Sequence, residues 1–280
     1  MRRAFRLWPT LYAFLICMAL FFGRSQDLNS FVPQIALHVQ NYFVPAVAHH
    51  LWSLAVEEHF YLLIGVAVWW LTRTKKSKTL ASWYWVPLTL MSAAPILRIV
   101  AVYLGEDPGA IQIQTHYRLD GLSAGVLLAM LSVYRPEKFR RLLEFKWLWV
   151  AAALSGYGFL WFVPKDSSAG VVVGFSVSYL AGAAFILFVH KSRIEVVLPS
   201  AARILAFLGI YSYALYIWHV PVSRVLAKSL SSTNLSLPPA AVISLDYVCS
   251  IVVAVFMSRL IEFPMMWVRD RLFPNPVHAV

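Results

Sequence analysis

Charged residues are scarce in this chain, and their scarcity sets the class of protein. Asp, Glu, Lys and Arg make up 13% of the 280 residues and hydrophobic residues 60%, whereas soluble globular domains carry roughly 25% charged residues. This composition excludes an ordinary soluble domain and predicts an integral membrane protein. Only two cysteines occur, Cys17 and Cys249, both inside apolar stretches. They exclude a disulfide framework or a thiolate metal site, and no other cluster has metal-ligand spacing, so no metal is expected.

Acidic residues are in particularly short supply. The chain has 13 Asp and Glu against 24 Lys and Arg, a formal net charge of +11. Such an excess is also found in nucleic-acid-binding proteins, but here the basic residues form short clusters between apolar stretches. That distribution is typical of the cytoplasmic loops of membrane proteins, so we expect a lipid bilayer and no nucleic acid as partner.

Long apolar stretches predict an all-α, polytopic membrane protein with about eight transmembrane helices. Such stretches are long enough to cross a bilayer as helices, which satisfy their own backbone hydrogen bonds. The alternating pattern of a β-barrel strand does not occur. The predicted spans are 7–23, 52–72, 82–104, 117–134, 147–164, 169–190, 204–223 and 238–261.

The basic clusters orient these spans. They fall in alternate segments, at 2–6, 73–78, 135–146, 191–203 and 259–271. Positively charged loops stay in the cytoplasm, which predicts both termini inside and a multi-pass protein of a bacterial inner membrane. The first span follows basic residues as a signal peptide would. However, no small-x-small cleavage pattern follows it, so we expect it to remain uncleaved.

The start of the second span is rich in polar residues. On a helix, His50, Ser53, Glu57 and Tyr61 share one face, and ionisable groups inside spans are candidates for function. Glu57 is therefore a candidate acid or base. An equally open interpretation is a structural Glu57, hydrogen-bonded to a neighbouring span.

Two arginines precede the first span. Arg3 and Arg6 are three residues apart, which suits charge-assisted binding of a phosphate, although ordinary anchoring at the membrane edge explains them as well. Pro9 is expected in the first turn of the helix.

Further polar candidates lie at the ends of spans. Arg118 and Asp120 begin the fourth span and suit either a partner span or a polar acceptor. Arg98 lies deeper and needs an acidic or carbonyl partner. His219 is either a hydrogen-bonded structural residue or a catalyst, and Glu262 is a further candidate.

Four segments together resemble the acyltransferase 3 family of membrane O-acyltransferases. They are RAFRLWP at 3–9, HLWSLAVEEHFY at 50–61, LGIYSYALYIWHVP at 208–221 and EFP at 262–264. They are similar to the family's Arg-x-x-Arg, Trp-Ser-Leu-x-x-Glu-x-x-Phe-Tyr, Ser-Tyr-x-x-Tyr-x-x-His-x-Pro and Glu-x-Pro elements. The match runs through most of the chain, so residues 1–280 are expected to form a single acyltransferase-like domain.

The resemblance implies transfer of an acyl group, usually acetyl, from acyl-CoA to a hydroxyl group of a glycan or glycolipid. Acyl-CoA is then a co-substrate, and no bound cofactor is expected. The implied catalytic residues are Glu57 and His50, and Arg3 and Arg6 are implied to bind CoA. The implied substrate-binding residues are Trp52, Ser53, Tyr61, Arg118, Asp120 and His219. No oligomeric state follows.

The chain also departs from the family pattern. Members usually have two more spans before the Arg-x-x-Arg element, and the first carries the histidine regarded as the catalytic base. Here Met1 directly precedes that element. Three explanations are open: a misassigned start codon, a truncated remnant, or substitution by His50 or His219. The alternative function is an inactive remnant or a non-enzymatic polysaccharide-pathway membrane protein such as a transporter, although residues 1–140 and 141–280 show no repeat.

Overall fold

The computed structural model describes residues 2–22, 27–43, 48–73, 83–192, 194–233 and 237–274. Helices dominate these ranges and no strand occurs in them, which confirms the all-α prediction. The expected absence of a cleavage site at 23–25 concerns residues outside these ranges. So do parts of the predicted basic clusters, namely Lys75, Lys76, Lys78 and Arg193.

Every predicted span coincides with a helix, although the helices differ in length. Six are long and apolar enough to cross a membrane: Arg3–Leu20, His49–Trp70, Trp85–Tyr103, Gly170–His190, Pro199–Ser232 and Pro239–Leu272. The two others are shorter, with 16 residues in α7 (Leu119–Tyr134) and 17 in α9 (Lys146–Phe162). A 16-residue helix rises about 24 Å, less than the roughly 30 Å of a hydrocarbon core. The predicted orientation of the spans stays a prediction.

The chain forms two compact units. The first consists of Met1–Ala36, Pro45–His50 and Leu198–Val280, so it joins the two ends of the sequence. The second consists of Leu37–Val44 and Leu51–Val197. The boundary falls within η1 (His49–Leu51), a single turn of 3₁₀-helix directly before α4 (Trp52–Arg73).

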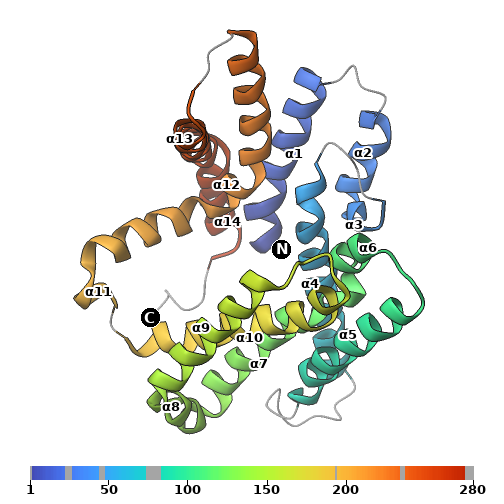
Figure 1. Ribbon diagram of the computed structural model, residues 1–280, viewed down its shortest axis with the longest axis vertical. Coiled ribbons are helices and arrows are strands. Elements are labelled where there is room, and N and C mark those ends of the chain that lie inside the picture. Colours follow the sequence, from blue (N-terminus) through green and yellow to red (C-terminus); the bar gives the residue numbers. More distant parts are fainter. Residues whose placement is uncertain are drawn as a thin grey trace. The chain divides into compact units, whose positions relative to one another are not determined.

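The first unit packs its early helices against its late ones. In Figure 1, α12 (orange) runs near α1 (blue) and α13 (red) packs on α12, and α1 also contacts η5 and α14. Its elements are α1 (Arg2–Phe22), α2 (Asp27–Ala36), α12 (Pro199–Ser232), α13 (Pro239–Met257), the π-helical turn η5 (Ser258–Glu262) and α14 (Phe263–Leu272). Leu11, Phe14, Ala214, Ile217 and Ala254 are buried almost completely, as expected of small and apolar residues at helix contacts.

The position of Pro9 differs from the prediction. Because α1 begins at Arg2, Pro9 lies inside the helix and not in its first turn. Proline has no N–H and so leaves one carbonyl of the preceding turn without its helical partner. Transmembrane helices tolerate this when neighbouring groups satisfy that carbonyl. The early start places Arg3 and Arg6 on the helix itself, three residues apart and therefore on one face.

The second unit is built around α7, which packs on α5 and α10. α9 and α10 run side by side (Figure 1), and they approach so closely that a Cβ on Gly156 would lie 2.7 Å from the Cβ of Ala181. In chain order its other elements are α3 (Gln40–Phe43), α4, α5 (Trp85–Tyr103), α6 (Pro108–Ile113), η3 (Thr115–Tyr117), α8 (Pro136–Glu144), the π-helical turn η4 (Gly170–Gly174), α10 (Phe175–Lys191) and α11 (Ile194–Val197).

Candidate functional site

A basic cavity lies at the start of α1 in the first unit. It has a volume of about 330 Å³ and is lined by Arg3, Arg6, Leu7, Tyr213 and Arg269. The two predicted phosphate ligands therefore share one cavity, and α14 adds a third arginine. The Tyr213 hydroxyl donates a 2.6 Å hydrogen bond to the Leu7 carbonyl, which links α12 to α1 at this level. Several guanidinium groups around one polar cavity are suited to an anion with several oxygens.

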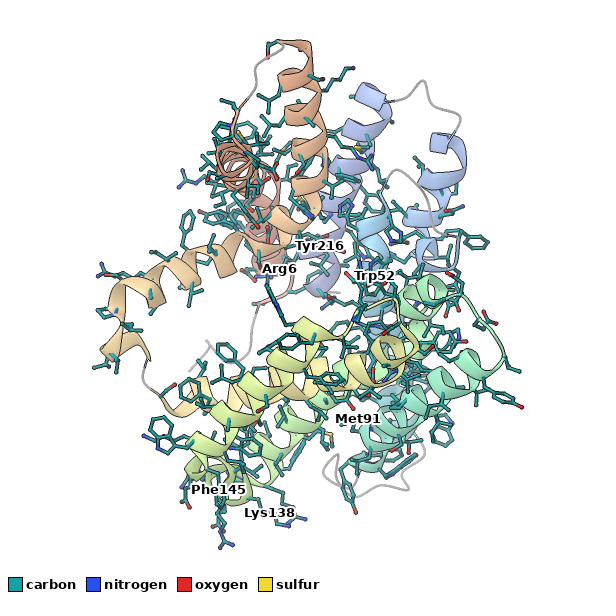
Figure 2. All side chains as sticks on the ribbon, in the orientation of Figure 1. Arg6, Trp52, Met91, Lys138, Phe145 and Tyr216 are labelled. Atoms are coloured by element: carbon teal, nitrogen blue, oxygen red, sulfur yellow. The ribbon has the colours of Figure 1, made fainter. Side chains whose placement is uncertain are left out.

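The side chain of Arg6 (labelled in Figure 2) is anchored by a buried carboxylate. Its Nε lies 3.2 Å from Oε1 of Glu262, which is completely buried, whereas the Arg6 side chain is 44% exposed. The Ser258 hydroxyl donates to the other carboxylate oxygen of Glu262 at 3.1 Å. Ser258 and Glu262 both belong to the π-helical turn η5, and such turns are frequent at functional sites. Glu262 thus holds one guanidinium nitrogen and leaves the rest of the group to the cavity.

Arg269 has a neighbouring carboxylate of its own. Its Nε and Nη2 each lie 2.9 Å from an oxygen of Asp270. This pairing offsets part of its charge but keeps the guanidinium in place. No spacing pattern marks this residue in the sequence, because it lies in an ordinary basic stretch after the last predicted span.

Two predicted histidines meet in the same unit, although 169 positions separate them. The rings of His50 and His219 are 5.3 Å apart between centroids and inclined by 75°. Phe14 packs edge-on against the His50 ring, with 6.2 Å between centroids. The hydroxyl of Tyr216 (labelled in Figure 2) donates a hydrogen bond to the His50 carbonyl. α1, η1 and α12 together therefore build an imidazole pair.

Backbone carbonyls fix the tautomers of this pair. Nδ1 of His219 lies 2.8 Å from the Tyr216 carbonyl, and Nε2 of His50 lies 3.3 Å from the Ile217 carbonyl. A carbonyl oxygen only accepts, so each of these nitrogens carries a hydrogen. In a neutral ring the other nitrogen then has a free lone pair. Within the described residues, Nδ1 of His50 is buried and has no hydrogen-bond partner.

The basic cavity and the imidazole pair both involve residues of α12, at different levels along the helix. Tyr213 lines the cavity, and His219 follows it six residues later on the same helix. Six residues of α-helix correspond to a rise of about 9 Å. Along α1, the same two levels are marked by Arg6 and by Phe14, which touches His50. The first unit thus offers an anion site and a basic nitrogen at successive levels.

The second unit carries the predicted face of α4. Ser53, Glu57 and Tyr61 lie on an unbroken α-helix at intervals of four residues, so they share a face as predicted. Ser53 and Glu57 are half-buried and Tyr61 is exposed. His50 precedes this helix in the 3₁₀ turn and belongs to the other unit, so its place on the same face stays a prediction.

Arg118 and Trp52 also meet in the second unit. The guanidinium carbon of Arg118 lies 3.9 Å from the ring centroid of Phe175 and 5.5 Å from that of Trp52, which Figure 2 labels at the start of α4. Such contacts stabilise a guanidinium against aromatic faces. Two of the predicted substrate-binding residues thus form one cation–π cluster.

Asp120, in contrast, lies in a buried ion pair. Its Oδ2 is 2.7 Å from Nη2 of Arg98, and both side chains are almost fully buried. Arg98 also donates to the Tyr117 carbonyl at 2.7 Å and to the Ser176 hydroxyl at 2.8 Å. This is the acidic and carbonyl environment that the sequence required for Arg98. Arg98 of α5 therefore contacts η3, α7 and α10 at this point, with Asp120 as its partner on α7. Direct contact of Asp120 with substrate stays a prediction.

A hydrogen-bonded network in the second unit was not predicted. The Asn41 amide donates to the Ile113 carbonyl at 3.2 Å and to the Thr115 hydroxyl at 2.8 Å. The Thr115 hydroxyl in turn lies 2.7 Å from Nδ1 of His59. The only sequence signal was the presence of polar residues in an otherwise apolar connection, and their partners are far away in the sequence.

Comparison with known proteins places the chain among acyltransferases. The model of an acyltransferase domain family matches residues 1–259. The O-acetyltransferase OatA of Staphylococcus aureus strain NCTC 8325 / PS 47 is 25% identical over 251 residues, which cover 79% of this chain and 40% of that protein. OatA of strain COL matches equally. The chain thus spans less than half the length of these curated relatives, and no solved structure matches it.

Proposed function

The chain belongs to the acyltransferase 3 family, and from this membership we propose that it transfers an acetyl group from acetyl-CoA to a hydroxyl group of a glycan. The names of the matched O-acetyltransferases support acetyl as the group and oxygen as its acceptor. The observation that carries the proposal is the presence, within the first unit, of a cavity lined by three arginines and of a pair of imidazoles at successive levels of α12. The proposed location is a bacterial inner membrane, with the arginines on the cytoplasmic side where CoA is present.

The basic cavity is the proposed CoA site. CoA carries several phosphate groups, and guanidinium groups bind phosphate through paired, charge-assisted hydrogen bonds. Arg3 and Arg6 present such groups from one helix face, and Arg269 adds another from α14. The ion pair with Glu262 reduces the side-chain freedom that Arg6 would lose on binding.

The imidazole pair is the proposed base. The lone pair of His50 or His219 takes the proton of the acceptor hydroxyl, and its oxygen attacks the thioester carbonyl carbon. The new C–O bond forms, the C–S bond breaks, and CoA leaves as a thiolate that takes up the proton from the imidazolium. Glu57, on α4, is the second candidate for the same role.

The acceptor is proposed to bind to residues of the second unit. Trp52 offers an aromatic face to a sugar ring, and Ser53, Glu57 and Tyr61 offer hydroxyl and carboxylate groups from one face of α4. Arg118 orients the Trp52 ring through their cation–π contact.

Turnover in nanodiscs tests the proposal. The purified chain would receive acetyl-CoA and a panel of cell-wall and O-antigen-type oligosaccharides. Release of the CoA thiol and mass spectrometry of the glycan would report transfer. We expect Arg3→Gln combined with Arg6→Gln to raise the KM for acetyl-CoA at least about tenfold, since each lost charged hydrogen bond is worth roughly 1.5–3 kcal/mol.

The matched control is Arg203→Gln, an exposed arginine of the same unit whose Nε donates to the carbonyl of Pro199 in its own helix. An unchanged KM in the double variant would overturn the CoA site. A lower kcat in Glu57→Gln, with kcat unchanged in His50→Gln and His219→Gln, would assign the role of general base to Glu57. Absence of turnover with every acceptor, despite CoA binding, would favour an inactive remnant.

A further inference from the structure

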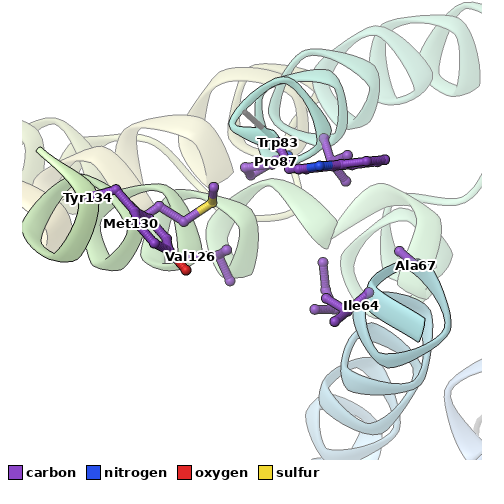
Figure 3. A pocket seen from close by; sticks show the side chains of 9 residues that line it. Ile64, Ala67, Trp83, Pro87, Val126, Met130 and Tyr134 are labelled. Atoms are coloured by element: carbon purple, nitrogen blue, oxygen red, sulfur yellow. The ribbon is translucent and has the colours of Figure 1, made fainter. Parts of the chain in front are cut away.

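A separate recess lies in the second unit, where the ends of α4 and α7 meet the start of α5. It begins as an apolar slot of about 180 Å³, and Figure 3 shows its side chains converging from these three helices. The lining residues are Ile64, Ala67 and Val68 of α4, Trp83, Val86 and Pro87 at the start of α5, and Val126, Met130 and Tyr134 of α7. None of these described lining residues is charged, so the slot suits a hydrocarbon chain.

The walls become cationic toward the end of α7. An adjoining cavity of about 320 Å³ shares Met130 and Tyr134 with the slot and adds Arg135 and Lys138. A third cavity, of about 280 Å³, shares Tyr134, Arg135 and Lys138 and is completed by Glu137 and Pro136. The three cavities therefore adjoin one another through shared lining residues, and together they form a path whose lining changes from apolar to charged.

The charged mouth is held by a well-anchored helix. The Phe139 ring of α8 packs edge-on against His190 of α10 at 5.4 Å, and the indole N–H of Trp149 donates to the Leu142 carbonyl at 2.7 Å. Lys138, labelled in Figure 2, and Arg135 are both exposed, and no ion pair joins either of them to another residue in the part of the chain that the structure describes. Their charges are thus free to meet a ligand.

We propose that this path binds one anionic phospholipid of the cytoplasmic leaflet. An acyl chain occupies the slot beside Met130, and the headgroup phosphate lies between Arg135 and Lys138. Basic pockets next to apolar grooves at the cytoplasmic ends of spans are the sites at which anionic headgroups bind. The predicted orientation places the 135–146 segment on that side of the membrane. Two cations outnumber the single carboxylate of Glu137 at the mouth, which favours an anionic over a zwitterionic lipid.

Such a lipid would stabilise the short helix α7 in the bilayer. α7 is too short to span the hydrocarbon core alone, so a lipid held at its end offsets part of the mismatch. None of the residues of this path lines the basic cavity of the first unit, so the inference does not depend on the proposed acyl transfer.

Native mass spectrometry of the detergent-purified chain tests the inference, with phosphatidylglycerol and phosphatidylcholine of equal chain length as probes. We expect one tightly retained phosphatidylglycerol per chain. Arg135→Gln combined with Lys138→Gln should weaken its binding about 10- to 30-fold, because each basic residue contributes roughly 1 kcal/mol to binding of anionic lipid. Arg140→Gln combined with Arg141→Gln removes the same charge from the same segment without touching the path, and it should change binding less than about twofold if the path is the site.

A second variant tests the apolar end. Ala67→Phe fills the slot and leaves both cations in place, so we expect loss of the retained lipid. Equal retention of the two lipids, or equal losses in the two double variants, would overturn the inference. So would retention of glycerol phosphate as firmly as of the whole lipid, or displacement of the lipid by CoA.

Discussion

Nε of Arg6 lies 3.2 Å from Oε1 of Glu262, so an ion pair joins the second turn of the first helix to the π-helical turn before the last one. The two residues are 256 positions apart in sequence. The carboxylate is completely buried, and its other oxygen accepts from Ser258. Because the arginine also lines the basic cavity, this pair links the stability of the first unit to its proposed binding of CoA.

Removal of the Arg6 side chain should affect both properties. Arg6→Ala leaves the buried carboxylate with the Ser258 hydroxyl as its remaining donor within the described residues, which should cost about 1–3 kcal/mol of unfolding free energy. Arg6 is nearly half exposed, so the coupling with Glu262 in a double-mutant cycle should be only about 0.5–1 kcal/mol. Thermal unfolding of Arg6→Ala, Glu262→Gln and the double variant in detergent measures it. Strictly additive effects would show that the pair is not coupled.

Substitution of either histidine should slow the proposed transfer without unfolding the protein. A positioned general base contributes about 10²- to 10⁴-fold to a rate, so at least one of His50→Gln and His219→Gln should lower kcat by that range. The pH–rate profile of this variant should lose its lower limb. His190→Gln, in the second unit, serves as the control and should keep the wild-type profile. Wild-type kcat in both histidine variants would contradict the assignment.

The helices were predictable from sequence because apolar stretches of this length have few other structures available in a membrane. Their ends were less so. The first helix starts at Arg2, because arginine side chains can reach the membrane edge from a helical backbone. Hydropathy alone does not include these residues in the span. The shortness of α7 was not evident either. The predicted span begins at Tyr117, but Tyr117 ends the separate 3₁₀ turn η3, and Arg118 links that turn to α7.

The candidate site was predictable only where local spacing encodes it. Arg3 with Arg6, and Ser53 with Glu57, lie at helical intervals, so a helix alone brings them together. The contact of His50 with His219 and the third arginine of the cavity, Arg269, depend on packing between distant segments. No periodicity in one sequence contains that information.

Loss of the Asp120 carboxylate should destabilise the second unit. Asp120→Asn leaves Arg98 buried with only neutral partners, and removing one member of a buried ion pair costs about 3–5 kcal/mol. The simultaneous change Arg98→Met and Asp120→Leu should restore much of this loss, because it removes both buried charges. The melting temperature of the three proteins in one detergent measures the difference. A native melting temperature for Asp120→Asn would mean that the pair contributes little and would favour a direct role for Asp120 with substrate.

Histidines outside the spans should make the second unit sensitive to acid. Nδ1 of His116 lies 3.3 Å from the Tyr42 hydroxyl, and the two rings are stacked with 6.0 Å between centroids. Burial lowers the pKa of His116, and the charge of Glu106 opposes that shift only in part. Burial likewise lowers the pKa of His38. In the folded state both rings therefore bind protons less readily than in the unfolded chain.

The sign of the pH dependence follows from these lowered pKa values. The unfolded chain takes up protons first, near its usual histidine pKa of about 6.5, so stability is complete above that pH and falls as the pH drops through the folded pKa. His116→Gln should reduce the loss of melting temperature between neutral and mildly acidic buffer, and His38→Gln should reduce it further. Tyr42→Phe retains the burial of His116 and should retain the acid sensitivity as well. Equal acid sensitivity in wild type and the histidine double variant would show that other groups control it.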